Sequence, residues 1–536
     1  MNYYNTTRVQ LDYLSGIKDH LIILFQLHIV KIFETRMSFA AAMSNVPVTT
    51  ENNAVSHGTT YSNTLNMFFK FVRRVDEKYV EDTFRDAYKE ERLTALKVLF
   101  HRRDCRGGVG ERSIFRVALV TLFKIDPETV FLNLGHIPNF GRWDDVFVLM
   151  PFCEHEVLKL VSEQLKADLV AMKDTKPVSL CAKWVPSEKG KLDVKYSIYS
   201  KLAGYMQISP RSLRKVYLVP LRHYLKVVET LLTAKQFDKI NFQEVPSQAM
   251  IKLKKAFAKK CPHWEAYVAK LAEGKVKVNA KLVDPHQLVD DYIKGKPLDV
   301  VTEAQWKVKE QEILEMGGLG KSVALVDVSG SMFGDNAIKV AVALGLLISK
   351  STSEPFRNCV MTFDTNPSFI QLQASESLFS SVKELLAIPW GGSTNFNACF
   401  EVLLERANNF QYPANHSKHP KVKGLVPEDM PDKIICISDM QFNQAGQMTN
   451  LESVKAQYKQ SKYKMPTIVF WNVRANTIDF PSTQDESNVA LISGFNVNIL
   501  KSIIKGEIAT PFEVMIDAIK DERYKVLKVA EAFELV

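Results

Sequence analysis

The chain has 536 residues, of which 46% are hydrophobic and 24% are charged. This balance is typical of a soluble globular protein and excludes disorder over most of the length. The length is too great for a single hydrophobic core, so two or three domains are expected.

Cysteine usage and apolar runs indicate the compartment. Seven scattered cysteines, with no C-x-x-C pair, argue against a disulfide framework or a structural zinc site. The apolar run at residues 21–30 is too short to span a bilayer, and a poor cleavage site follows it. We therefore expect a cytoplasmic protein that can also be nuclear and that has no membrane partner. A start at Met37 is as consistent with the sequence as one at Met1.

The net charge of +9 is unevenly distributed. Residues 61–320 carry 44 basic against 33 acidic side chains, and residues 321–536 carry 21 against 23. Within residues 181–280 the counts are 20 and 7. Such asymmetry predicts an anionic partner for the N-terminal half.

Residues 1–60 are predicted to form a flexible N-terminal segment, since Ala, Ser, Thr and Asn dominate residues 38–62. From residue 61 to 315 the apolar residues recur at helical spacing, as at Leu65, Phe68 and Phe69. Glycine and proline breaks divide this stretch into many helices. The pattern predicts an all-α domain of stacked helical hairpins, a HEAT-like repeat.

The pattern changes at the glycine-rich residues 316–320. Short, apolar, β-branched runs then alternate with helical stretches, which predicts a doubly wound α/β domain over residues 321–536. The expected strands are residues 322–327, 356–363, 433–438 and 467–471, and the expected helices are residues 337–350, 397–407 and 451–462.

Hydroxyl and carboxylate side chains gather at the predicted strand ends. Asp327, Ser329 and Ser331 follow the first strand, Thr394 closes the tight loop at residues 391–395, and Asp439 follows the strand ending at residue 438. Ligands bind at the carboxyl edge of such sheets, and hard oxygen donors suit Mg²⁺, with Ca²⁺ or Mn²⁺ as alternatives. Serines also cap helices, but three segments arriving in order at strand ends favour the metal site.

A catalytic interpretation has less support. No G-x-S-x-G, H-E-x-x-H or phosphate-binding G-x-x-x-x-G-K-[ST] motif is present, and no histidine lies beside the predicted ligands. We therefore expect a protein that is not an enzyme and has no small-molecule substrate, with a metal-dependent hydrolase as the least favoured alternative.

Basic side chains cluster twice in the helical half, with Tyr217 and Tyr224 among the first cluster. Basic groups interleaved with aromatic rings suit the binding of phosphates and stacked bases. The alternative to nucleic-acid binding is a solvated helix face that only keeps the protein soluble. The candidate RNA-binding residues are Arg211, Arg214, Lys215, Arg222, Lys252 and Lys255.

A second candidate is the turn at residues 102–112. Backbone amides after its glycines could hold a phosphate beside Arg102, Arg103 and Arg106. The favoured alternative is a tight helix–helix turn with arginines on the surface.

These features together resemble a known group. Asp-x-Ser-x-Ser, followed by a threonine and an aspartate, is similar to the metal-ion-dependent adhesion site of von Willebrand factor A domains. The fusion of a helical region to such a domain resembles the TROVE-module proteins, whose model is the Ro RNA-binding autoantigen, and a eukaryotic and viral family of the same layout. The segments that carry the family resemblance are Arg106-Gly-Gly-Val-Gly-Glu-Arg112, Ile137-Pro-Asn-Phe-Gly-Arg-Trp-Asp-Asp145, Lys183-Trp-Val-Pro-Ser187, Trp390-Gly-Gly-Ser-Thr394 and Ile437-Ser-Asp-Met-Gln441.

The resemblance implies a metal held by Asp327, Ser329 and Ser331, with Thr394 and Asp439 acting directly or through water. It also implies an open coordination position for a partner's carboxylate, and a helical ring that takes single-stranded or misfolded RNA. We expect a non-enzymatic, ribonucleoprotein-type protein that binds RNA through its helical half and Mg²⁺ and a protein partner through its A domain. The alternative is a metal-dependent interaction scaffold without RNA.

Overall fold

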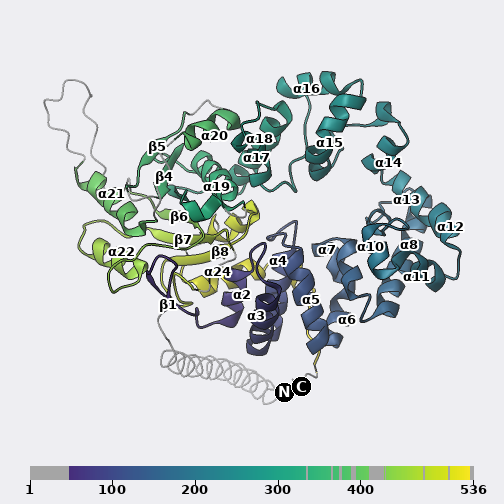
Figure 1. The fold of residues 1–536 in the computed structure, drawn as a ribbon, viewed down its shortest axis with the longest axis horizontal. Coiled ribbons are helices and arrows are strands. Elements are labelled where there is room, and N and C mark those ends of the chain that lie inside the picture. Colours follow the sequence, from purple (N-terminus) through teal and green to yellow (C-terminus); the bar gives the residue numbers. More distant parts are fainter. Residues whose placement is uncertain are drawn as a thin grey trace, which may run out of the picture.

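The computed structural model describes residues 48–531, except residues 334–335, 364–365, 374–376, 388–393, 410–427, 429, 475–476, 478 and 505–507. After a short hairpin, helices make up the chain from residue 63 to residue 315, and a six-stranded sheet with flanking helices follows (Figure 1). The predicted combination of a helical N-terminal part and an α/β C-terminal part is confirmed. In the described residues no helix is long and apolar enough to cross a bilayer.

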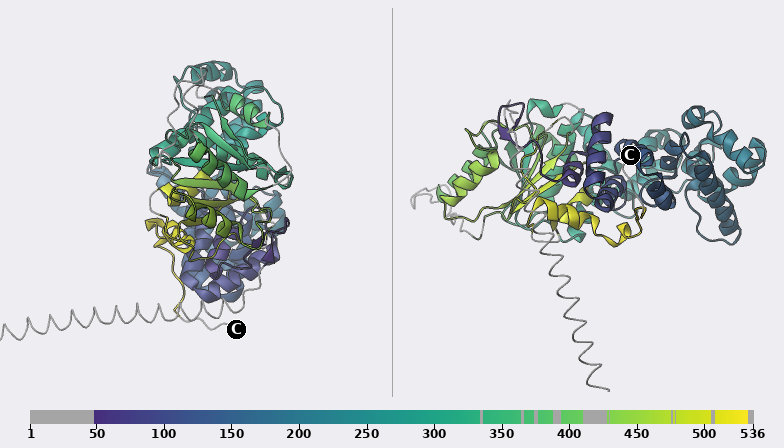
Figure 2. Two further views of the ribbon diagram at one scale, coloured as in Figure 1. Left: turned by 90° about the vertical axis from the view of Figure 1, so that its left-hand side faces the viewer. Right: turned by 90° about the horizontal axis from the view of Figure 1, so that it is seen from below.

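The helical part runs in an arc away from the sheet and back to it (Figure 1). Seen from below, the sheet lies at one end of the elongated molecule and the helices around α11 lie at the other (Figure 2). The longer helices of the helical part are α2 (Asn63–Lys70), α3 (Glu77–Glu90), α4 (Arg92–Arg103), α5 (Ser113–Ile125), α6 (Pro127–Asn133), α8 (Glu154–Lys173), α11 (Ile198–Tyr205), α15 (Ser247–Lys260), α16 (Trp264–Ala272), α17 (His286–Ile293) and α18 (Val300–Glu315).

Shorter helical pieces connect these. They are η1 (Leu134–His136), α7 (Ile137–Phe140), η2 (Trp143–Leu149), α9 (Cys181–Trp184), α10 (Lys191–Tyr196), α12 (Pro210–Ser212), the π-helical η3 (Leu213–Leu218), α13 (Val219–Tyr224), α14 (Val228–Thr233) and η4 (Phe237–Lys239). Helix starts fall where the sequence supplies a cap. The Asp126 carboxylate accepts the amide of Thr129 at 3.0 Å, and Pro127 occupies the first position of α6.

Two hydrophobic cores divide the helical part. The larger core is continuous with the interior of the sheet. The smaller core lies between residues 228 and 301 and contains the mutually packed rings of Phe242, Phe257, Trp264 and Tyr267. Helices α14, α15 and α16 therefore form a lobe with an interior of its own.

The sheet has the strand order β5-β4-β3-β6-β7-β8, in which only the edge strand β5 is antiparallel. The chain moves outward from β3 to β4, then returns to place β6 on the other side of β3, so the order reverses between β3 and β6. The elements are β3 (Ser322–Asp327), η5 (Gly330–Phe333), α19 (Ala337–Ser351), β4 (Cys359–Phe363), β5 (Phe369–Gln371), α20 (Leu378–Leu386), α21 (Phe396–Asn409), β6 (Lys433–Ser438), α22 (Asn450–Lys459), β7 (Thr467–Asn472), β8 (Val489–Ser493), η7 (Val497–Leu500), α23 (Lys501–Ile504), α24 (Pro511–Ile519) and η8 (Glu522–Tyr524).

Helix α19 packs very closely on β3, because a glycine faces the strand. A Cβ atom at Gly345 would lie 2.4 Å from Cγ2 of Val326, which is closer than any real contact of this kind. Both elements are buried along almost their whole length. This close packing fixes β3, whose last residue is Asp327, against the helix that follows it.

The N-terminal segment is only partly as predicted. Residues 1–47 lie outside the described residues, but β1 (Val48–Thr49) and β2 (Val55–Ser56) form an antiparallel hairpin on the α/β part. The Thr50 hydroxyl donates to the carbonyl of Phe442 at 2.8 Å, and the Ser56 hydroxyl donates to Asp479 at 2.7 Å. The expected flexible segment is therefore wrong for residues 48–60, because partners 392 and 423 residues away hold them in place.

The arginines at the end of α4 join the helical part to the sheet. Arg102 is fully buried and donates to the carbonyl of Phe71 and to both oxygens of Ser493 in β8. Arg103 is also buried and forms an ion pair with Asp145 at 2.7 Å. The expected surface position of these two side chains is wrong, because their charges are satisfied inside the protein. Arg106 alone of the three is exposed.

The C-terminal segment also crosses back to the helices. The Tyr524 hydroxyl donates to Asp104 at 3.0 Å, and the amide of Ala530 donates to Thr129 at 2.9 Å. The carbonyl of Lys528 accepts from Asn133 at 2.6 Å. Contacts from both ends of the chain therefore hold the helical part and the α/β part together.

We predict that Arg102→Met lowers the free energy of unfolding by about 3 kcal/mol, since it leaves buried carbonyl and hydroxyl groups of Phe71 and Ser493 without a donor. Urea unfolding monitored by circular dichroism measures the change. Arg106→Met on the exposed side of the same turn is the control, with little effect expected. Equal midpoints for the two variants would contradict the structural role of Arg102.

Candidate metal centre

The predicted ligands lie at the carboxyl edge of the sheet, where the strand order reverses. Asp327 is the last residue of β3, and Asp439 follows the last residue of the neighbouring strand β6. In open α/β sheets this reversal point is where ligands bind. Both carboxylates are completely buried, so neither can rely on water to stabilise its charge.

The strand ends hold the Asp327 carboxylate on both sides. Its Oδ1 accepts the backbone amide of Ser329 at 2.9 Å, and its Oδ2 accepts the Ser438 hydroxyl at 2.6 Å. The Ser438 hydroxyl itself accepts the amide of Met440 at 2.9 Å. The orientation of the carboxylate is therefore fixed before any ligand binds.

The two serine hydroxyls after β3 lie next to one another. Oγ of Ser329 and Oγ of Ser331 are 3.0 Å apart. Adjacent corners of an octahedron with the 2.0–2.1 Å bonds of Mg²⁺ are separated by about 3.0 Å, so the pair already has the spacing of two neighbouring ligands. Ser329 is buried, and Ser331 is partly exposed in η5.

Asp439 already has a cationic neighbour. Nη1 of Arg474 lies 3.1 Å from Oδ2 of Asp439 and donates to the carbonyl of Ser331 at 3.1 Å. The other oxygen of Asp439 accepts the amide of Gln441 at 3.3 Å. Nε of Arg474 is buried and has no hydrogen-bond partner in the described part of the chain. A guanidinium thus stands beside the carboxylate that the sequence assigns to the metal.

Thr394 reaches the same edge from the N-terminal end of α21. Its hydroxyl donates to the carbonyl of Gln441 at 2.5 Å and accepts from the Asn52 side chain at 3.2 Å. The Asn52 amide also donates to the Gln441 carbonyl at 2.7 Å. The loop at residues 391–393, predicted to deliver Thr394, lies outside the described residues.

The electrostatics of the centre favour a cation. The pKa of Asp327 is raised to about 7: burial is the largest cause and the charge of Asp439 adds to it, while hydrogen bonds from Ser329 and Ser438 act in the opposite direction. Two carboxylates in a water-poor site repel one another. A divalent ion would relieve both the burial penalty and the repulsion.

The donor set fits a hard cation. It combines the carboxylates of Asp327 and Asp439 with the hydroxyls of Ser329, Ser331 and Thr394, all oxygen ligands of the kind that Mg²⁺ and Ca²⁺ prefer. In the described residues no group of three or more His, Cys, Asp or Glu side chains could hold a metal ion. This site has only two such side chains, and hydroxyls supply the rest.

The candidate RNA-binding residues fall in two separate places. Arg211, Arg214 and Lys215 are exposed on α12 and η3, whereas Lys252 and Lys255 line a pocket beside α15.

Arg222 differs from the other candidates. Its guanidinium donates to the carbonyls of Ala182 and Val185 at 2.8 and 2.7 Å, so it holds α13 to the end of α9. Replacing Arg222 would disturb the fold as well as the surface charge.

Three residues at the centre were not predicted from the sequence, namely Asn52, Gln441 and Arg474. Arg474 stands just beyond the predicted strand 467–471, so its place at a strand end was a usable signal. Gln441 belongs to the segment that carried the resemblance. Asn52 gave no signal, since only the fold brings the N-terminal hairpin to this edge.

The fold and the centre together define a class of protein: a helical region joined to an α/β domain with a buried cluster of carboxylate and hydroxyl oxygens at the carboxyl edge of its sheet. Residues 50–155 and 152–319 match the family described as Domain of unknown function (DUF2828), and residues 321–532 match Domain of unknown function (DUF7788). A curated relative is "Uncharacterized protein L728" of Acanthamoeba polyphaga mimivirus. It is 30% identical over 513 residues, which cover 88% of this chain and 87% of the viral protein. The chain belongs to the DUF2828 family, and its similarity to the viral protein extends over both parts of the structure.

We predict that Arg474→Met increases the affinity of the protein for Mg²⁺ or Mn²⁺ by about tenfold or more. The guanidinium would compete with a metal ion for Asp439, and a charged hydrogen bond of this kind is worth about 1.5–3 kcal/mol. Titration calorimetry measures the dissociation constant. Arg357→Met, at an exposed arginine elsewhere on the α/β part, should leave it unchanged. Weaker metal binding by Arg474→Met would mean that the guanidinium supports the metal.

Proposed function

We propose that this protein is a non-enzymatic binding protein whose α/β domain holds a divalent cation, most favourably Mg²⁺, and uses it to bind a protein partner. The observation that carries the proposal is the meeting of Asp327, Ser329 and Ser331 with Asp439 at the reversal point of the sheet. Asp327 and the two serines would be direct ligands. Asp439 and Thr394, both already hydrogen-bonded, would act directly or through water.

The strand order supports assignment of the domain to the von Willebrand factor A class. Five parallel strands with an antiparallel strand at the β5 edge suit such a domain, and the Asp-x-Ser-x-Ser motif follows its first strand. In that class the metal keeps a coordination position for a carboxylate of the partner. Mg²⁺ bound by few protein ligands retains exchangeable waters, so the chemistry is the same for this chain.

The surroundings of the centre also suit a protein partner. Phe333, two residues after Ser331, is 63% exposed. Met448, on the loop between β6 and α22, is 45% exposed. Aromatic residues and methionine are enriched at the centres of protein–protein interfaces. A carboxylate of the partner bound to the metal, together with an apolar contact between the partner and Phe333, would give affinity for the partner and fix its orientation on the domain.

RNA binding by the helical half is the second candidate function, and the charge distribution favours it. Arg211, Arg214 and Lys215 are exposed on adjacent turns, within the stretch of residues 181–280 that has 20 basic and 7 acidic side chains. Tyr217 and Tyr224 lie in the same stretch and are not fully buried. Contacts to phosphate would supply most of the affinity, and stacking on the tyrosines would favour single strands.

We predict that saturating Mg²⁺ raises the melting temperature of the wild-type protein and that Asp327→Ala abolishes this increase, because a ligand bound only by the folded state stabilises it. Asp439→Ala should reduce the increase less. Differential scanning fluorimetry with and without chelator measures the shift. Asp432→Ala, at an exposed carboxylate near the opposite end of β6, should behave as wild type. A full shift in Asp327→Ala would refute the site.

We also predict that Arg211→Ala/Arg214→Ala weakens binding to single-stranded RNA. Fluorescence anisotropy at several salt concentrations should show the negative slope of log affinity against log salt becoming shallower by about 1.4, since each phosphate contact on a single strand contributes about −0.7. Lys520→Ala/Lys525→Ala removes two exposed positive charges near the C-terminus and should leave the slope unchanged. If the wild-type protein binds no RNA even at low salt, the scaffold alternative stands.

A further inference from the structure

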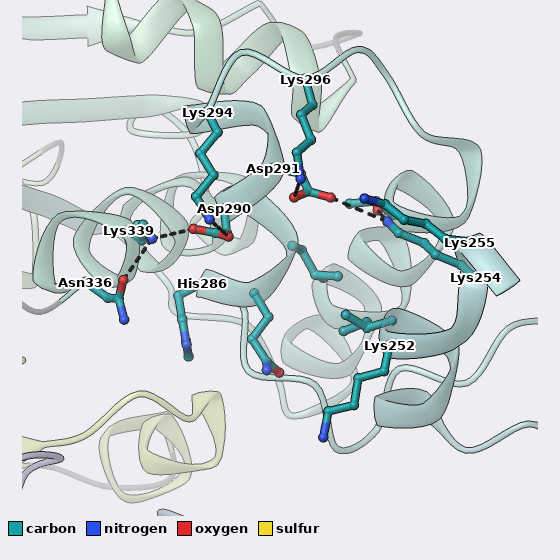
Figure 3. Close-up of a pocket in the computed structure, with 14 residues that line it drawn as sticks. Lys252, Lys254, Lys255, His286, Asp290, Asp291, Lys294, Lys296, Asn336 and Lys339 are labelled. Atoms are coloured by element: carbon teal, nitrogen blue, oxygen red, sulfur yellow. Dashed lines mark hydrogen bonds and ion pairs between the residues drawn. The ribbon is translucent and has the colours of Figure 1, made fainter. Parts of the chain in front are cut away.

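A lysine-lined pocket lies between α15 of the smaller lobe and the helices α17 and α19 (Figure 3). Its volume is about 580 Å³, within the range of small-molecule sites. Six lysines and only two aspartates line it: Lys252, Lys254, Lys255, Lys294, Lys296, Lys339, Asp290 and Asp291. We propose that this pocket binds a small soluble anion that carries two or more phosphate groups.

The two aspartates do not neutralise the pocket, because each is shared by two lysines. Asp290 forms ion pairs with Lys294 and Lys339, and Asp291 forms ion pairs with Lys254 and Lys296 (Figure 3). Burial alone would raise the pKa of Asp290, but hydrogen bonds from its two lysines outweigh burial and hold the pKa below its usual value. Asp290 thus stays charged, and the ion pairs of both aspartates hold the lysines in place while the wall keeps a positive excess.

Lys252 and Lys255 complete the positive wall from the α15 side. Both side chains are exposed, and neither forms an ion pair within the described part of the chain. Lys254, between them, is bound to Asp299 and Thr302. Two ammonium groups without an ion pair in the described part of the chain therefore line the pocket on the α15 side. Lys294 and Lys296, which follow α17, and Lys339 of α19 line its other side, an arrangement suited to an anion with more than one charged group.

The start of α19 adds further donors. Asn336 stands at the N-cap position and lines the pocket, but its side chain makes no capping hydrogen bond and instead accepts from Lys339 at 2.8 Å. The positive end of this 15-residue helix therefore contributes to the site. Nδ1 of His286 is buried at the pocket wall and has no hydrogen-bond partner in the described residues.

The lining favours a compact phosphate compound over an RNA strand. Apart from the His286 ring, its 14 residues include no aromatic side chain on which a base could stack. The only apolar residues of the lining are Ile251 and Leu288. The pocket thus offers many ammonium groups and little surface for a base or sugar. The inference goes beyond the proposed function and does not depend on metal or RNA binding.

The experiment is calorimetric titration with inorganic tripolyphosphate, in buffer with chelator and without divalent metal, at constant ionic strength. We expect the wild-type protein to bind it, and Lys252→Glu/Lys255→Glu to lose about tenfold or more in affinity. Lys259→Glu/Lys260→Glu is the matched control, because it makes the same charge change at exposed positions of α15 outside the pocket. Its affinity should stay at the wild-type value.

No binding by the wild-type protein, or an equal loss in both double variants, would overturn the proposal. If Lys252→Glu/Lys255→Glu fails to fold, the neutral variant Lys252→Gln/Lys255→Gln should show a smaller loss in the same direction. Displacement of tripolyphosphate by single-stranded RNA at equal phosphate concentration would overturn the small-anion assignment in favour of an RNA backbone. This result can be interpreted even if the protein binds neither metal nor RNA, since the direct titration contains no divalent metal and no RNA.

Discussion

The need for positive charge beside two buried carboxylates is the constraint on which the centre depends. The strand order puts the ends of β3 and β6 side by side, and so brings Asp327 and Asp439 into one water-poor place. The two carboxylates cannot move apart or toward the solvent without a change in the sheet, because Gly345 lets α19 pack tightly against β3. Arg474 supplies part of the compensation for Asp439, and the fixed hydroxyls of Ser329 and Ser331 have the spacing that a divalent ion would use.

The centre is a property of the whole chain and not of the α/β part alone. The N-terminal hairpin places Asn52 on Thr394 and on the carbonyl of Gln441. The buried Lys70 of α2 donates to Thr477 and to the carbonyl of Asp479, whose carboxylate accepts from Gln441. Burial lowers the pKa of Lys70 to about 7, while the charge of Asp479 raises it. A partner or ligand that moves the helical part would thus also act on the loop after β6.

Local patterns sufficed for the parts of the fold that local forces determine. The predicted strands 322–327 and 433–438 coincide with β3 and β6, since continuous apolar runs of that length are typical of buried parallel strands. The edge strand β5 was not predicted, because its three residues are too short a run to recognise. The strand β8 was missed although its five residues form an apolar run of the predicted kind. The hairpin around Asn52 was not predicted, because partners far along the chain hold it in place. Arg102 shows the same limit: a charged side chain in a glycine-rich turn indicates a surface, and only tertiary packing buries it. The candidate metal ligands follow strand ends and could be named from spacing, whereas the ion pair between Arg474 and Asp439 could not be predicted in this way.

Manganese location in a crystal tests the central claim most directly. Mn²⁺ has the ligand preferences of Mg²⁺ and gives an anomalous signal. Crystals of the full chain grown with Mn²⁺ should show one strong anomalous peak about 2.1–2.3 Å from the hydroxyl oxygens of Ser329 and Ser331, with Arg474 withdrawn from Asp439. A saturated crystal without a peak there, and with Arg474 still bound to Asp439, would contradict the assignment. The two carboxylates would then be balanced by the protein's own arginine.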